Sequence, residues 1–205
     1  MKPDYFTIES EAEYVLTVEK SRFIARAYPV ETSAAALEIL KKLRKEFYDA
    51  SHICSAFVMG ADGNKQKFSD AGEPQGTAGL PIIECIKRKN LKNVLLAVVR
   101  YFGGKKLGAG GLARAYSAAA SGALNACTVA EMRYCSYISV TVPFSEGCKI
   151  LDFPVKSKTY IDGVTTVYAV PLNEKAAFTA AVSATYSGAA VIVDEGEGYW
   201  RVNKL

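Results

Sequence analysis

A chain of 205 residues, half of them apolar, can bury a core in one or two domains, and nothing in its composition suggests disorder or a collagen-like repeat. The longest apolar runs fall far short of the roughly 18 residues a spanning helix needs, and the first five residues do not resemble a secretory signal, so we expect a cytoplasmic protein without membrane contact. The net charge of +4 is uneven, because residues 81–115 carry eight basic residues against one acid. Such a segment either attracts phosphate-bearing partners, or its basic residues simply lie on different solvent-exposed faces of the protein.

The cysteines argue against metal or redox chemistry. They are odd in number, form no C-x-x-C pair and share the chain with a single histidine, His52. We therefore expect free, buried thiols in a reducing compartment, no metal and no cofactor. The five are Cys54, Cys85, Cys127, Cys135 and Cys148.

The first 70 residues predict strands around a helix. Apolar residues alternate on both sides of a tight turn at Glu19 and Lys20, and Thr32 and Ser33 offer a cap to a run with helical spacing. The expected elements are strands 14–18 and 21–30, a helix 33–48 and strands 53–59 and 65–69.

The middle of the chain predicts two helices around a central strand. Thr77 can cap the first helix, and Pro81 is tolerated in its first turn. A continuous apolar run indicates a strand in the middle of a sheet. The expected elements are a loop 70–76, a helix 77–89, a strand 94–99, a glycine-rich loop, and a small-residue helix that opens at Gly111 and Leu112.

After a connector at residues 127–134 the pattern restarts. The order β-α-β-β-α-β, with a glycine hairpin at its centre, matches a small ferredoxin-like α+β domain. We expect an α+β protein with two domains, 1–130 and 131–205. The expected elements of the second domain are strands 137–142, 155–160, 164–170 and 190–195, a helix 174–186, and a helical or irregular stretch at 145–151.

The glycine-rich loop that leads into the small-residue helix is the strongest candidate site. Glycines let backbone N–H groups approach an anion, a helix amino terminus adds positive charge, and cations neutralise phosphate. The pattern is no known nucleotide motif, and the glycines could instead form a tight turn that helps the helix pack. The expected anion or nucleic-acid site comprises Arg100, Gly103, Gly104, Lys105, Lys106, Gly108, Gly110, Gly111 and Arg114.

A second polar segment, residues 69–79, leads into another helix. Asp70 and Glu73 could bind a cation or act as acid and base, but an Asp before a glycine turn usually holds the backbone, and we favour that role. His52 is better explained as a capping or core-edge residue than as a catalytic one, and no recognisable catalytic set is present. The polar residues of this candidate cleft are His52, Ser69, Asp70, Glu73, Gln75 and Thr77.

Aromatic residues accompany the basic segment. Tyr101, Phe102 and Tyr116 could stack bases beside the cations, as in many proteins that hold single-stranded nucleic acid. Alternatively, Phe102 belongs to the core and the tyrosines fill domain edges.

Four segments, 20–25, 49–52, 68–79 and 99–112, resemble the YigZ/IMPACT family in order and spacing. The resemblance covers about residues 15–125, and the C-terminal part is more loosely similar to the ferredoxin-like domain of bacterial members. It implies an N-terminal fold like the second domain of ribosomal protein S five. It also implies that the segments around His52, 70–79 and 100–111 meet in one cleft, and that the protein acts near translation, which eukaryotic members regulate through protein contacts.

Two functions remain open. In the first, which we favour, the protein docks on RNA, the ribosome or a translation factor through the basic cleft. In the second, it is an enzyme acting on a small phosphorylated metabolite or nucleotide. There, Arg100, Lys105 and Lys106 would hold phosphate, Asp70 or Glu73 would serve as base or Mg²⁺ ligand, and His52 would serve as acid. The sequence does not fix the oligomeric state.

Overall fold

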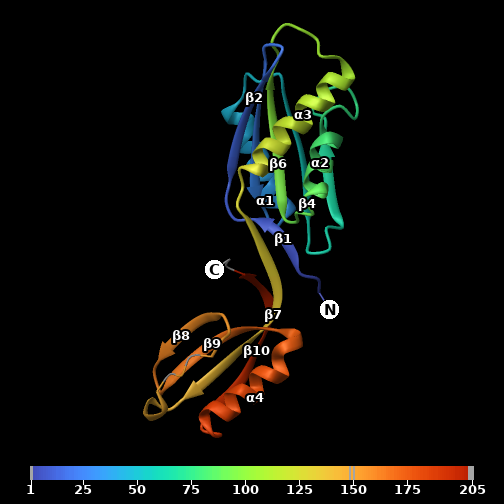
Figure 1. Cartoon of the computed structure of the whole chain (residues 1–205). Helices are drawn as coiled ribbons and strands as arrows, with labels where there is room; N and C mark the ends of the chain where they lie inside the picture. Colours follow the sequence, from blue (N-terminus) through green and yellow to red (C-terminus); the bar gives the residue numbers. More distant parts are fainter. Residues whose placement is uncertain (1, 148, 150, 203–205) are drawn as a thin grey trace. The chain divides into compact units, whose positions relative to one another are not determined.

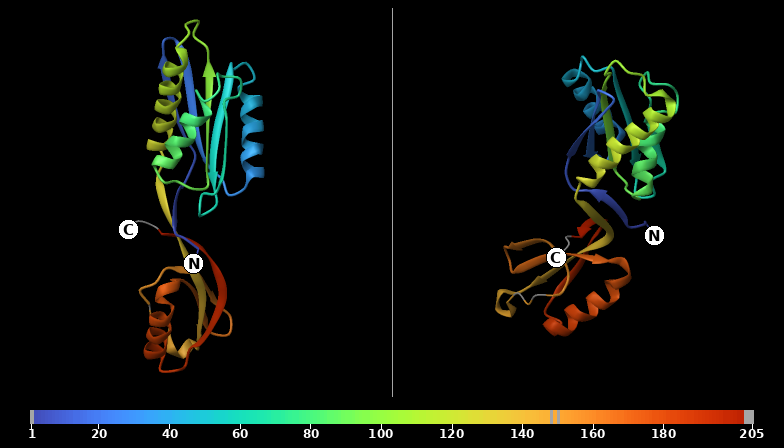
Figure 2. Two further views of the ribbon diagram at one scale, coloured as in Figure 1. Left: turned by 90° about the vertical axis from the view of Figure 1, so that its right-hand side faces the viewer. Right: turned by 45° about the horizontal axis from the view of Figure 1, so that its top comes forward.

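The computed structural model describes residues 2–147, 149 and 151–202 and forms two compact units, residues 1–131 and 132–205 (Figure 1). Both units combine a β-sheet with helices, so the protein is of mixed α/β construction. In the first unit the sheet order is β2-β3-β6-β4-β5. Helices α2 and α3 cover one face of this sheet and α1 covers the other (Figure 2).

The first unit follows the predicted order of strands and helices, apart from an additional strand at Tyr5–Ile8 that was not predicted. Glu19 and Lys20 both have positive φ values, 46° and 64°, which suits the tight turn of the first hairpin. The side chain of Thr32 caps α1 by accepting from Ala35 N at 3.1 Å. The elements are β1 (Tyr5–Ile8), β2 (Ala12–Val18), β3 (Ser21–Pro29), α1 (Ser33–Glu46), β4 (His52–Met59), β5 (Lys65–Ser69), α2 (Gly79–Arg88), β6 (Val94–Tyr101) and α3 (Gly108–Asn125).

Strand β6 lies at the centre of the sheet and supplies both core layers, which confirms the prediction from its apolar run. Val94, Leu96 and Val98 pack under α2 and α3, whereas Leu95 and Ala97 pack under α1. Alternate residues of a strand point to opposite faces, so a strand buried on both sides must be apolar throughout. Small side chains on α3 let that helix lie close to the sheet.

Three boundaries around the candidate site differ from the predictions. Arg100 is the penultimate residue of β6 rather than part of the loop. Helix α3 begins at Gly108, three residues earlier than predicted, because Leu112 and the alanines behind it draw the glycines into a helical turn. Helix α2 has Ala78 as its N-cap, so the predicted cap at Thr77 is wrong.

In the second unit, α4 packs on one face of the sheet (Figure 1). Its Phe178 and Val182 contact apolar residues of the two central strands, β7 and β9. Strand β9 pairs with β7 and β8, and β10 pairs with β7. The elements are β7 (Val129–Val142), η1 (Phe144–Glu146), β8 (Val155–Tyr160), β9 (Val164–Pro171), η2 (Leu172–Glu174), α4 (Lys175–Tyr186) and β10 (Val191–Val202).

Two predictions for this part of the chain need correction. The predicted connector at 127–134 contains the boundary between the two units, but its residues 129–134 form the first part of β7. The expected stretch at 145–151 contains only the short turn η1, and residues 148 and 150 lie outside the described residues.

The prediction of free, buried thiols is confirmed for three of the four described cysteines. Cys54, Cys85 and Cys135 are free and buried, Cys127 is free and half-buried, and Cys148 lies outside the described residues. Within the described ranges, no helix combines the length and apolar character needed to cross a membrane.

Candidate anion-binding site

Three segments of the first unit meet at one end of its sheet. His52 begins β4 and lies opposite Arg100 in the antiparallel register, and Glu73 reaches them from the loop before α2. Arg100 Nη1 donates to Glu73 Oε1 at 2.7 Å, and His52 Nε2 lies 4.0 Å from Glu73 Oε2. The side chains of Arg100 and Glu73 are only 6% and 3% exposed, so this is a buried ion pair.

Arg100 is fixed from several directions. Its Cζ lies 5.4 Å from the ring centroid of Phe23 and 5.5 Å from that of Phe102, within the range of cation–π attraction. Nη2 makes a long contact of 3.4 Å to Ser21 Oγ, whereas Nε is buried without a partner among the described residues. The guanidinium is therefore an anchor of the site, with its charge balanced by Glu73.

Glu73 also joins a buried hydrogen-bond network. The Tyr116 hydroxyl donates to Glu73 Oε1 at 2.8 Å and accepts from Cys54 Sγ at 3.4 Å. Burial raises the pKa of Cys54 to about 12 and also raises the pKa of Tyr116. Because Tyr116 is fully buried, it is not available to stack a base, and of the two interpretations of this residue only a structural one remains.

Asp70 holds the loop in front of α2. Its carboxylate accepts from the backbone N–H groups of Gly76, Ala78 and Gly79 at 2.8 to 3.0 Å. Burial alone would raise the pKa of Asp70, but these three amides together hold that pKa below its ordinary value. Asp70 thus performs the capping that the sequence assigned to Thr77, and its favoured structural role agrees with the geometry.

The other residues of the predicted cleft are placed around this loop. The Thr77 hydroxyl donates to Pro74 O at 2.6 Å, and Ser69 Oγ accepts from Ala71 N at 3.3 Å. Gln75 is exposed. Of the predicted cleft residues, Glu73 is the one that lines the pocket described below.

The glycines of the loop have different roles. A Cβ on Gly103 would lie 2.1 Å from the carbonyl carbon of Lys20, so only glycine lets the loop pass the first hairpin this closely. Gly104 and Gly108 have φ values of 85° and 69° with open space around them, which indicates turns. Gly110 and Gly111 belong to the first turn of α3.

The amino terminus of α3 faces a pocket of about 320 Å³. The N-cap residue Leu107 makes no side-chain cap, and the first turn carries no acidic residue. The first N–H groups of a helix lack partners within the helix and carry partial positive charge, so they favour an anion. The pocket is lined by Glu73, Pro74, Arg100, Phe102, Lys106, Leu107, Gly108, Ala109 and Leu112.

The predicted cations divide into paired and unpaired groups. Lys105 Nζ lies 2.7 Å from Glu19 Oε2 at the surface, and Arg100 is paired with Glu73. Lys106 and Arg114 are exposed and make no ion pair within the described part of the chain. Both line a second pocket, of about 540 Å³, which shares Lys106 and Leu107 with the first.

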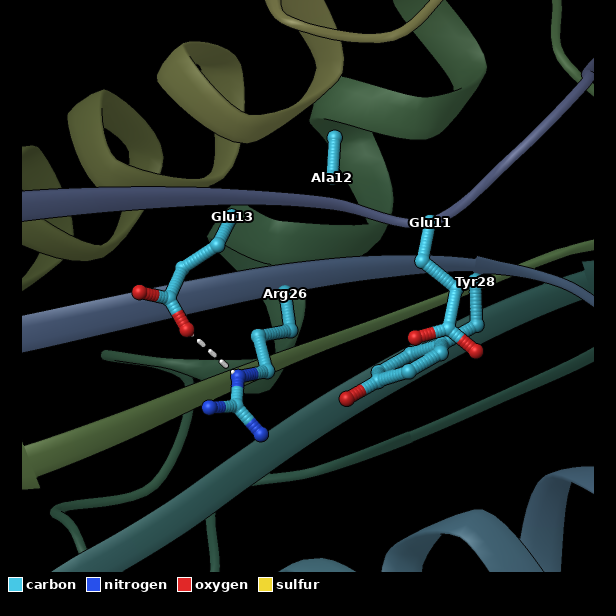
Figure 3. A pocket seen from close by; sticks show the side chains of 5 residues that line it. All are labelled: Glu11, Ala12, Glu13, Arg26 and Tyr28. Carbon is cyan, nitrogen blue, oxygen red and sulfur yellow. Dashed lines mark hydrogen bonds and ion pairs between the residues drawn. The ribbon is translucent and has the colours of Figure 1, made fainter.

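A third pocket, of about 360 Å³, lies on β2 and β3 and is less suited to an anion. Figure 3 shows Glu13 and Arg26 reaching toward each other from these neighbouring strands. Arg26 also pairs with Glu46, whose hydrogen bond is the main cause of its raised pKa. With Glu11 close by, this pocket offers no unpaired cation.

The described residues contain no group of three side chains able to hold a metal ion. His52 Nδ1 lies 3.0 Å from Ala71 O, and donation by Nδ1–H would leave Nε2 facing Glu73. The site can therefore attract an anion by electrostatics. The uncapped start of α3 and Lys106 supply positive charge, and the buried pair of Arg100 and Glu73 beside them is neutral overall.

Residues 19–124 match the model of the Impact N-terminal domain, which defines the class of this protein. The chain belongs to the IMPACT family. It is 45% identical over 133 residues to the IMPACT family member YvyE of Bacillus subtilis and 40% identical over 113 residues to the IMPACT family member YigZ of Escherichia coli. The first match covers 65% of this chain and the second 54%, and they span 61% and 55% of those relatives.

A solved structure described as the crystal structure of a hypothetical protein is similar over most of the chain. It is 28% identical, has a TM-score of 0.65, and the match covers 94% of this chain and 98% of that one. The mixed α/β architecture therefore also occurs in a solved relative.

Proposed function

We propose that this protein is a translation-associated binding protein that docks on RNA, alone or within the ribosome or a complex with a translation factor, through the pocket at the start of α3. The observation that carries the proposal is the uncapped amino terminus of α3 beside the unpaired Lys106. Backbone N–H groups and a lysine are suited to a phosphate oxygen. Membership of the IMPACT family supports a role near translation, and a cytoplasmic location belongs to the same proposal.

The charges around the pocket support a phosphate on Lys106 rather than on Arg100. Arg100 already balances Glu73, and its side chain is almost completely buried. Lys106 and Arg114 are exposed and unpaired among the described residues, and they lie in the basic segment 81–115. Arg100 and Glu73 then form a fixed part of the pocket lining, while Lys106 and the backbone amides at the start of α3 contact the partner.

Fluorescence anisotropy with a labelled single-stranded RNA decamer, over a range of salt concentrations, tests this proposal. Lys106→Glu should weaken binding and lower the slope of log affinity against log salt by about 1. Lys67→Glu on β5 is a matched control, because it reverses one exposed charge of the same unit away from the pocket. Equal losses in both variants, or no salt dependence, would contradict the proposal.

One observation favours the second candidate, an enzyme for a small phosphorylated metabolite or nucleotide. Glu73 lines the pocket and its second oxygen faces His52 at 4.0 Å. Asp70 is less suited to be a base or Mg²⁺ ligand, because three backbone amides already occupy its carboxylate. A thermal-shift panel of nucleotides and sugar phosphates tests this alternative, since a ligand at 100 times its dissociation constant adds about 2.7 kcal/mol.

We also infer the finer fold assignments from the order of elements. In the second unit, β9 and β10 are linked by α4 and separated in the sheet by β7, an arrangement typical of a split βαβ and hence of a ferredoxin-like domain. The short turn η1 stands where the first helix of that fold would be. For the first unit, the strand and helix order supports a fold like the second domain of ribosomal protein S five.

A further inference from the structure

Phe102 is an exposed aromatic ring at the edge of the anion pocket. It follows β6 directly, is 50% exposed, and lines the 320 Å³ pocket together with Lys106 and the start of α3. Its backbone N–H donates to Ser51 Oγ at 3.1 Å, which fixes the chain where it leaves the strand. An exposed ring held beside a phosphate site is the arrangement that stacks bases of single-stranded nucleic acid.

The ring lies near the buried guanidinium of Arg100, which in turn lies near Phe23 in the core. The Arg100 Cζ lies 5.4 Å from the ring centroid of Phe23 and 5.5 Å from that of Phe102. Phe23 is fully buried, and Arg100 is held by Glu73, so the two groups near Phe102 cannot move freely. A flat group that binds Phe102 therefore meets a preorganised surface, which lowers the entropic cost of binding.

The cavities on either side of Lys106 suit a ligand longer than one nucleotide. The pocket of about 540 Å³ adjoins the first through Lys106 and Leu107 and is also lined by Arg114 and by the ion pair of Lys105 with Glu19. Apolar side chains, among them Leu16 and Val18, line the same pocket. A chain that carries both phosphates and flat bases matches this combination of cations and apolar side chains.

Resting on the proposed function, we infer that the bound RNA is single-stranded and that one of its bases stacks on Phe102 while an adjacent phosphate lies at the amino terminus of α3. A duplex keeps its bases stacked on each other and so leaves no base face for Phe102. An acidic peptide would satisfy Lys106 but would bring no flat group to the ring.

The test compares a single-stranded RNA decamer with an abasic ribose-phosphate chain of the same length, using the full chain and anisotropy. Phe102→Ala and Phe102→Leu should each weaken binding of the RNA roughly 5- to 150-fold, the range for loss of one stacked base. Neither should change binding of the abasic chain. Phe102→Trp should retain RNA binding, and Tyr48→Ala, which removes an 85% exposed ring elsewhere in the unit, should leave it unchanged.

The outcomes separate this inference from the proposed function. If both Phe102 variants bind the RNA as well as the unmodified protein, base stacking is refuted and phosphate binding stands. If Lys106→Glu leaves binding of the abasic chain unchanged, the phosphate site itself is refuted. Preference for duplex RNA, or tighter binding of a polyglutamate peptide than of the single strand, would also overturn the inference. Unchanged circular dichroism of each variant confirms that it is folded.

Discussion

The buried pair of Arg100 and Glu73 should be the strongest single polar contribution to the stability of the first unit. Arg100→Met leaves the Glu73 carboxylate, 3% exposed, with Tyr116 and no neighbouring guanidinium. Loss of one partner of a buried ion pair costs about 3–5 kcal/mol because the remaining charge stays desolvated. We expect a loss of this size, which lowers the ratio of folded to unfolded protein by roughly a hundredfold to a few thousandfold.

The assay must separate the two units. The single tryptophan, Trp200, lies in the second unit, so its fluorescence in urea reports that unit. Hydrogen exchange of the backbone amides of β6 reports the first unit, and only this signal should change in Arg100→Met. Arg26→Met is the matched control, since Arg26 is 24% exposed in its ion pairs and such pairs contribute about 0–1 kcal/mol.

A double variant tests the charge argument itself. Arg100→Met combined with Glu73→Leu leaves no buried charge, so it should be less destabilised than the sum of the two single variants by about 2 kcal/mol or more. A loss below about 1 kcal/mol in Arg100→Met, or additive losses in the double variant, would refute the reasoning.

Three further predictions concern the loops and the thiols. Asp70→Ala should cost about 1–2 kcal/mol at neutral pH in urea unfolding followed by hydrogen exchange of α2. The pKa of Asp70 in the folded state lies below its unfolded value of about 3.9. The stabilisation by its carboxylate is therefore fully present above about pH 3.9 and disappears as the pH falls through the folded-state pKa. If Asp70→Ala differed from the unmodified protein by the same amount at pH 2 and pH 7, this explanation would be excluded. Gly103→Ala should lower the free energy of unfolding by more than about 2 kcal/mol, because its Cβ would meet backbone at 2.1 Å. Gly104→Ala, which has open space but a positive φ, should lower it by about 1 kcal/mol. The reverse order in thermal unfolding would contradict these roles. Iodoacetamide labelling followed by mass spectrometry should modify the half-buried Cys127 before Cys54, whose pKa is about 12, and early labelling of Cys54 would argue against its burial.

Local signals in the sequence predicted the elements well where one segment decides its own structure. The apolar run of β6 indicated a central strand, and Glu19 and Lys20 indicated a tight hairpin. The length of β7 was missed because its first residues are strand only through pairing with other parts of the chain. Pairing of this kind depends on tertiary context that propensity does not contain.

In the candidate site, too, local features could be predicted from the sequence and long-range contacts could not. Its glycines and cations were visible in the sequence, but the pairing of Arg100 with Glu73, 27 residues apart, was not. Nor could composition distinguish the close approach at Gly103 from the turn at Gly104, because both need glycine for different reasons. The burial of Tyr116 did leave a signal, since it lies four residues after Leu112 on the apolar face of α3.

The most direct measurement is a titration of ¹⁵N-labelled protein with the single-stranded RNA decamer, followed by the amide chemical shifts. If phosphate binds at the start of α3, the amides of Gly108, Ala109 and Gly110 should shift first and in proportion to occupancy, and Lys106→Glu should reduce these shifts. Inorganic phosphate at high concentration should move the same amides. Shifts confined to β5 or to the second unit, with the amides at the start of α3 unchanged, would contradict the binding site.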